Sequence, residues 1–158
     1  MRRTDREVTE MSEILDIVRR AKVLHLGLFD EGYPYIVPLH YGYAVRDGAL
    51  TFYMHGAKEG HKLDLIRKNP RVCVELECDV EPIPGGEHPC RYGAAYASVM
   101  GRGTAALVTE EAEKITGLEL LMKHQTGREF TIDGGMAAAV EVIAVTLSEV
   151  TAKARPKP

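Results

Sequence analysis

Hydrophobic and polar residues alternate at every second position over much of the chain, which is the pattern of strands. The alternation is clear around His25, which separates Leu24 from Leu26. Turn-forming triplets at 30–32 and 46–48 join the first of these segments as β-hairpins. The pattern predicts about six strands, at residues 22–30, 33–45, 49–55, 71–80, 96–108 and 138–154.

Helical spacing of hydrophobic residues occurs in three segments, at residues 11–20, 62–68 and 109–125. Asn69-Pro70 ends the second segment, because proline disfavours helical backbone at the residue before it. Thr109 is expected to cap the third, which carries acidic residues in its first turn. Residues 81–90 contain three prolines and two glycines and are predicted to form a loop. We therefore expect two or three helices beside the strands.

The short connections between strands favour a largely antiparallel sheet. Closure of such a sheet into a barrel removes its exposed edges, so the sequence predicts a mainly β fold, a β-barrel with peripheral helices. Gly101 and Gly103 indicate a bulge or a close backbone approach within the fifth strand. The length of 158 residues fits a single domain, residues 1–155, with a disordered tail at 156–158.

Composition excludes several classes of protein. The net charge of -3 and the absence of Trp argue against a nucleic-acid-binding domain. No apolar run approaches the roughly 18 residues of a membrane span, and the charged N-terminus lacks a signal-peptide core. Three cysteines form no disulfide framework, which fits a reducing compartment. We expect a cytoplasmic protein without nucleic-acid or membrane partners.

The cysteines do not predict a metal site. Cys73, Cys78, His88 and Cys90 are the residue types of a zinc site, but their spacing contains no C-x-x-C pair. Two core cysteines and one loop cysteine are the simpler interpretation. A Cys90 nucleophile beside His88 is disfavoured, because two residues in a proline-rich loop do not make a triad. No metal is therefore predicted.

The stretch 52–70, "FYMHGAKEGHKLDLIRKNP", carries the most specific chemistry. A strand ends at His55, a flexible loop follows, and a helix begins near His61 or Lys62. The first turn of a helix has free N–H groups and a partial positive charge, so it attracts anions. Lys62 is unfavourable there unless an anion neutralises it, and phosphate is the natural candidate. A solvated loop with exposed lysines is the alternative.

This stretch, with its Asn-Pro stop before a strand, resembles the flavin-binding split barrels of the pyridoxamine 5′-phosphate oxidase-like superfamily. The hairpin "LHLGLFDEGYPYIVPLHYGY", the strand "YASVMGRGTAALV" and the closing "VIAVTLSEVTAKAR" are similar to the nitroimidazole-resistance (Nim) branch. The resemblance covers roughly residues 1–155. It implies an FMN-binding split barrel that forms a homodimer, with the cofactor in a cleft between the subunits.

The resemblance also implies site residues. One strand offers its backbone to the flavin ring, and the matching residues are Val37, Pro38, Leu39, His40 and Tyr41. The family's Arg-Lys pair, which holds the FMN phosphate, corresponds to His61 and Lys62, and histidine grips phosphate less well than arginine. His55 corresponds to a position near the phosphate and ribityl chain. Tyr96 and Ser98 would reach the cofactor from the other side of the cleft.

The resemblance further implies a flavin-dependent oxidoreductase acting on small molecules such as nitroaromatic, 5-nitroimidazole-like compounds, by hydride transfer at flavin N5. The chain lacks the Trp- and Arg-containing segment of the vitamin B6 oxidases, so that activity is not expected. His40 and His55 are the candidate proton donors. FAD, deazaflavin or heme are alternative cofactors, heme with His40, His55 or His61 as axial ligand, and a flavin-binding module without turnover is a further alternative.

Overall fold

The computed structural model describes residues 3–157. The strands are β1 (Glu7–Val8), β2 (Val23–Asp30), β3 (Tyr33–His40), β4 (Gly42–Arg46), β5 (Ala49–Gly56), β6 (Arg71–Ile83), β7 (Gly93–Leu107) and β8 (Glu141–Arg155). The helices are α1 (Met11–Arg20), α2 (His61–Lys68), α3 (Glu111–Thr126) and α4 (Gly134–Ala138), with 3₁₀ turns at Thr4–Arg6 and Pro89–Arg91. None of these helices is long and apolar enough to cross a membrane.

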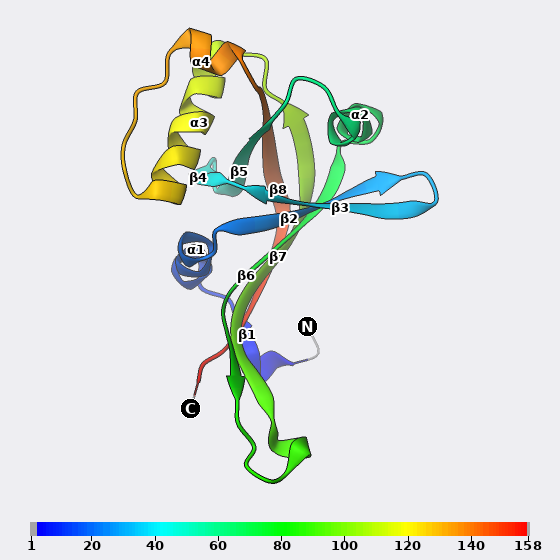
Figure 1. The fold of residues 1–158 in the computed structure, drawn as a ribbon, viewed down its shortest axis with the longest axis vertical. Coiled ribbons are helices and arrows are strands. Elements are labelled where there is room, and N and C mark those ends of the chain that lie inside the picture. Colours follow the sequence, from blue (N-terminus) through cyan, green and yellow to red (C-terminus); the bar gives the residue numbers. More distant parts are fainter. Residues whose placement is uncertain (1–2, 158) are drawn as a thin grey trace.

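All strands pair antiparallel in one sheet of order β3-β2-β6-β7-β8-β5-β4, and β1 pairs with β8. The predicted mainly β fold is thus confirmed, with eight strands rather than about six among the described residues. Figure 1 shows the strongly curled sheet with helices at its periphery. The sheet does not close by hydrogen bonds between β3 and β4, as expected of a split barrel.

The two edge strands meet at a corner of the chain. The segment 33–45 was predicted as one strand, but it breaks at Tyr41, between the end of β3 and the start of β4. Tyr41 is fully buried, and its hydroxyl donates to the carbonyls of Val18, at 2.7 Å, and Ala21, at 3.1 Å. Gly42 is needed beside it, because a Cβ there would lie 2.2 Å from the backbone nitrogen of Leu121 in α3. Contacts with two helices therefore set the corner.

Hydrophobic residues on the inner face of the sheet form the main core. Leu24, Leu26 and Leu28 on β2 are buried, and the residues between them are not. α1 packs on this core through Ile14, Ile17 and Val18, and α2 through Leu63, Leu65 and Ile66. A second, smaller cluster includes Tyr53 together with Leu118 of α3 and Ala137 of α4. The helices at 11–20 and 62–68 are confirmed to within one residue.

β6 and β7 continue beyond the barrel as a long hairpin (Figure 1). The predicted loop at 81–90 is wrong in part, since Pro82 pairs with Ala94 and Ile83 with Gly93. A register shift between Cys78 and Glu81, with Asp79 at φ 56°, marks where the hairpin leaves the barrel. β2 pairs with β6 only around residues 73–75, so residues 81–83 form an edge, where proline is tolerated.

Two further local predictions are corrected, and one is confirmed. α3 begins after Glu110, without a side-chain cap, so Thr109 is not its N-cap. Of the two cysteines predicted to lie in the core, Cys73 is exposed and Cys78 only packs against the core while partly buried. A register shift at Gly103 confirms the bulge, and a Cβ on Gly103 would lie 2.1 Å from the carbonyl oxygen of Thr146. The disorder predicted for 156–158 stays a prediction, and Pro158 lies outside the described residues.

Candidate functional site

The start of α2 presents free N–H groups. Its N-cap is Gly60, whose φ of 145° is readily adopted only by glycine, and no side chain caps the helix. The backbone N–H of Leu63 bonds to the Gly60 carbonyl at 2.9 Å. The N–H groups that precede it, of His61 and Lys62, have no intrahelical acceptor. This helix end is therefore suited to an anion.

Lys62 folds back over the end of β5. A Cβ built on Gly56 would come within 2.8 Å of Lys62 Nζ, so the ammonium lies where only glycine leaves room. Lys62 is half-buried. Within residues 3–157 no carboxylate forms an ion pair with it. The uncapped helix start, Gly56 and Lys62 form what we call the α2 cradle.

His55 and His40 lie beside the α2 cradle. His55 is near the end of β5 and His40 is the last residue of β3. The pKa of His55 is lowered, first by desolvation and then by the nearby charges of Lys62 and His40. The Nδ1–H of His40 donates to the Lys22 carbonyl at 3.2 Å, and in the described part of the chain Nε2 has no hydrogen-bond partner. The structure thus brings together three of the predicted site residues, from β3, β5 and α2.

His61 is engaged elsewhere. Its Nε2 lies 2.7 Å from Oδ2 of Asp30, at the tip of the β2–β3 hairpin. Its ring also meets the Tyr35 ring edge-on, with centroids 5.1 Å apart. Its ring is thereby held by a carboxylate outside the α2 cradle, and within residues 3–157 Lys62 is left as the cation of the cradle without an ion-pair partner.

The predicted cofactor strand is an edge of the sheet. Among residues 3–157, β3 pairs with β2 alone, so the backbone groups on its other side are unpaired in the described part of the sheet. Pro38 and His40 are exposed, Val37 and Leu39 pack partly against the core, and Tyr41 is buried. The backbone of this strand is thus available to a ligand, as the resemblance implies. Its contact with a flavin stays a prediction.

Tyr96 and Ser98 lie far from the α2 cradle in the same chain. His55 pairs with Val142 near the start of β8, whereas Tyr96 and Ser98 pair with Arg155 and Lys153 at its end. At about 3.3 Å per strand residue, Ser98 and Tyr96 are roughly 36 and 43 Å from His55 along β8. One chain therefore does not assemble all the predicted residues around one ligand.

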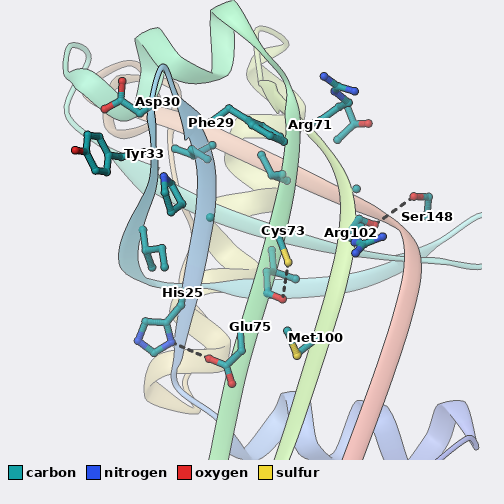
Figure 2. A pocket seen from close by; sticks show the side chains of 18 of the residues that line it. His25, Phe29, Asp30, Tyr33, Arg71, Cys73, Glu75, Met100, Arg102 and Ser148 are labelled. Atoms are coloured by element: carbon teal, nitrogen blue, oxygen red, sulfur yellow. Dashed lines mark hydrogen bonds and ion pairs between the residues drawn. The ribbon is translucent and has the colours of Figure 1, made fainter. Parts of the chain in front are cut away.

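A groove of about 850 Å³ runs over the outer face of β2, β3, β6 and β7, the face turned away from the core (Figure 2). Its walls include four large hydrophobic residues that are more than half exposed: Phe29, Tyr33, Ile36 and Met100. Arg71 lies over the Phe29 ring at 5.6 Å, and Arg102 lies further along. We call this feature the outer groove. None of the predicted site residues lines the outer groove. The apolar residues at outward positions of the β2–β3 hairpin were the signal in the sequence that could have indicated it.

The last turn of α3 fixes the corner next to His40. Gln125 Nε2 donates to the Tyr41 carbonyl at 2.9 Å and to the Lys22 carbonyl at 3.2 Å. His124 Nε2 donates to the Ala21 carbonyl at 2.9 Å, and its ring packs on Tyr41 with centroids 4.7 Å apart. Burial lowers the pKa of His124 to about 4. Sequence reasoning gave His124 no role, because its acceptor is distant in the chain.

The sequence profile of the pyridoxamine 5′-phosphate oxidase family matches residues 10–154. No curated protein sequence matches the chain significantly. Among solved structures, a candidate 5-nitroimidazole antibiotic resistance protein from Bacteroides thetaiotaomicron is 28% identical. It aligns with a TM-score of 0.79 over 93% of this chain and 85% of its own.

Two more distant structures have a similar fold. The FAD and heme binding protein from Mycobacterium smegmatis aligns with a TM-score of 0.78 at 16% identity, over 97% of this chain and 75% of its own. A candidate pyridoxamine 5′-phosphate oxidase from Listeria innocua aligns with a TM-score of 0.57 at 24% identity, over 88% and 94%. At these identities the likeness concerns the fold alone.

Proposed function

Because the chain belongs to the pyridoxamine 5′-phosphate oxidase family, we propose that it binds FMN and acts as an oxidoreductase on small molecules. The observation that carries the proposal is the α2 cradle, in which an uncapped helix start carries Lys62 and the Lys62 ammonium lies against Gly56. A terminal phosphate matches this donor set in charge and in hydrogen bonding.

Each part of the site has a proposed role. Lys62 and the first N–H groups of α2 hold the phosphate, and the free edge of β3 over Val37–Tyr41 binds the polar rim of the ring. When bound, the flavin supplies hydride transfer at N5. His55 lies close enough to Lys62 and His40 for their charges to lower its pKa, and the Nδ1–H of His40 is committed to the Lys22 carbonyl.

His55 or His40 is the proposed proton donor to a reduced substrate. The lowered pKa leaves His55 mostly neutral at neutral pH. If His55 donates the proton, turnover should therefore rise as the pH falls toward its pKa. A turnover that is flat in this range, and equally flat in His55→Gln, would assign the role to another group.

We further propose a homodimer that completes the site. Tyr96 and Ser98 cannot reach the α2 cradle of their own chain, and the outer groove exposes Phe29, Tyr33, Ile36 and Met100. Contiguous apolar surface of this kind marks protein interfaces. Light scattering should therefore give a dimer mass for the wild type and a monomer mass for Ile36→Arg. Val45→Arg, which replaces an exposed hydrophobic residue of β4 outside the groove, is the control.

The cofactor is tested by the colour of the purified protein and by titration. An FMN protein shows the two visible bands of oxidised flavin and binds FMN more tightly than riboflavin, which lacks the phosphate. A single intense Soret band would instead indicate heme, with His40, His55 or His61 as candidate ligand. Tighter binding of FAD or a deazaflavin would move the assignment to that cofactor. A protein that gains no band with any of them would refute the proposal.

The proposed substrates are nitroaromatic compounds such as 5-nitroimidazoles, in line with the candidate resistance protein at 28% identity. The holoprotein can be reduced chemically under anaerobic conditions and mixed with a 5-nitroimidazole. Recovery of the oxidised flavin spectrum, with loss of nitro-group absorbance, is the expected result. Reoxidation by oxygen alone would leave flavin binding in place and contradict this substrate class.

A further inference from the structure

A cluster of one histidine and two glutamates lies at one end of the outer groove. Glu75 and Glu77 are two residues apart on β6, so their side chains share a face of the strand. His25 on β2 is the direct cross-strand partner of Glu75. His25 Nδ1 lies 3.1 Å from Oε2 of Glu75 and 3.9 Å from Oε2 of Glu77, and Figure 2 shows the first pair facing across the strands.

These three donor atoms have the spacing of a metal-ligand set. All lie within 4.8 Å of one another. An ion about 2.0–2.2 Å from each imidazole nitrogen and carboxylate oxygen requires donors about 3–3.5 Å apart. Small rotations of partly exposed side chains therefore suffice, and the strand register already fixes the backbone.

The charge of the cluster also favours a cation. His25 Nδ1 faces both Glu75 and Glu77, so one imidazole lies against two carboxylates. The two carboxylates stand next to each other on one face of β6, where they repel each other. A divalent ion bound between the two carboxylates would attract both and so offset their mutual repulsion.

We propose that His25, Glu75 and Glu77 bind a divalent transition-metal ion such as Zn²⁺ at the edge of the outer groove. One imidazole and two carboxylates form a ligand set that zinc accepts, and three protein ligands leave a fourth position for water. None of the three ligands belongs to the α2 cradle. Sequence spacing did not indicate it, because β2 and β6 meet only through the sheet register.

The experiment is calorimetric titration of the untagged protein with Zn²⁺ at neutral pH. We expect saturable binding of up to one ion per chain, and weak binding of Mg²⁺, which prefers octahedral oxygen ligands. His25→Asn, Glu75→Gln and Glu77→Gln should each weaken Zn²⁺ binding by at least about tenfold, since loss of even an outer-shell partner commonly costs that much. Zn²⁺ should raise the melting temperature of the wild type but not of Glu77→Gln.

Two controls make the assignment specific. Glu149→Gln removes a carboxylate from β8, paired with Arg102 of the groove wall, and should leave Zn²⁺ affinity unchanged. Cys73→Ser removes the exposed thiol two residues before Glu75 and should also leave it unchanged. Absence of saturable binding would overturn the proposal, as would loss of binding in Cys73→Ser or wild-type affinity in all three ligand variants. All three ligand positions are partly exposed, and circular dichroism verifies that each variant is folded.

Discussion

Lys62→Met tests the α2 cradle most directly, because methionine keeps much of the aliphatic length of lysine and removes the charged ammonium with its N–H donors. Lys62 Nζ lies against Gly56, half-buried, with no carboxylate competing for it among the described residues. A hydrogen bond to a charged group contributes about 1.5–3 kcal/mol. The FMN dissociation constant should therefore rise by roughly 10- to 150-fold.

Two further results identify the lost contact as a phosphate contact. Riboflavin, which lacks the phosphate, should bind Lys62→Met and the wild type equally. The ligand-free variant should be slightly more stable, by about 0.3–1 kcal/mol, since a cation at a helix N-terminus opposes the helix dipole. Lys62→Met is therefore expected to bind FMN more weakly than the wild type while being at least as stable.

Fluorescence-quenching titration of FMN and riboflavin measures both affinities, and urea unfolding measures stability. Lys58→Met is the matched control, since it removes an exposed lysine from the loop before α2 and should change neither affinity by more than about twofold. An FMN affinity of Lys62→Met within twofold of wild type, or an equal loss for riboflavin, would refute the phosphate assignment.

Three other predictions concern the corner, the bulge and His61. With its folded pKa at about 4, below the usual histidine value, His124 resists protonation, so the free energy of unfolding should fall by up to about 3 kcal/mol between neutral pH and pH 4. Urea unfolding of His124→Gln, which can keep the bond to Ala21, should show a weaker pH dependence. Gly103→Ala should cost about 1–3 kcal/mol or more in thermal unfolding, because its Cβ would strike the Thr146 carbonyl, whereas Gly32→Ala, with nothing within 4 Å, should be nearly neutral. His61→Arg alone should barely tighten FMN binding, because Asp30 would pair with the guanidinium. The double variant that combines His61→Arg with Asp30→Asn should bind FMN more tightly.

Local patterns in the sequence predicted the elements whose causes are local. The helix at 11–20 and the hairpin turning at 30–32 follow from hydrophobic spacing and turn residues within each segment, and both are present. The break at Tyr41 follows from contacts with α1 and α3, which no pattern near residue 41 reveals. Pro82 was misjudged for a similar reason, because only the sheet order shows that it lies on an edge.

The candidate site divides in the same way. Lys62 could be found because a helix start is visible in sequence and the family resemblance supplied the phosphate. The pairing of His61 with Asp30 could not, since it joins α2 to the tip of another hairpin. The cluster of His25 with Glu75 and Glu77 likewise depends on how β2 registers against β6. Which side chains meet across the sheet depends on the pairing register of strands that are distant in the sequence. The periodicity within one strand carries no information about that register.

Asp30 physically connects the α2 cradle to the outer groove. Its carboxylate holds His61 at the start of α2, and the same residue lines the groove beside Phe29 and Tyr33. A second chain seated in the groove would fix the hairpin tip, and with it the position of His61 and the first turn of α2. A phosphate bound at that turn would in return favour the hairpin position that the second chain requires. Because such coupling is reciprocal, FMN binding and dimerisation should strengthen each other, and the site would be complete only when both have occurred.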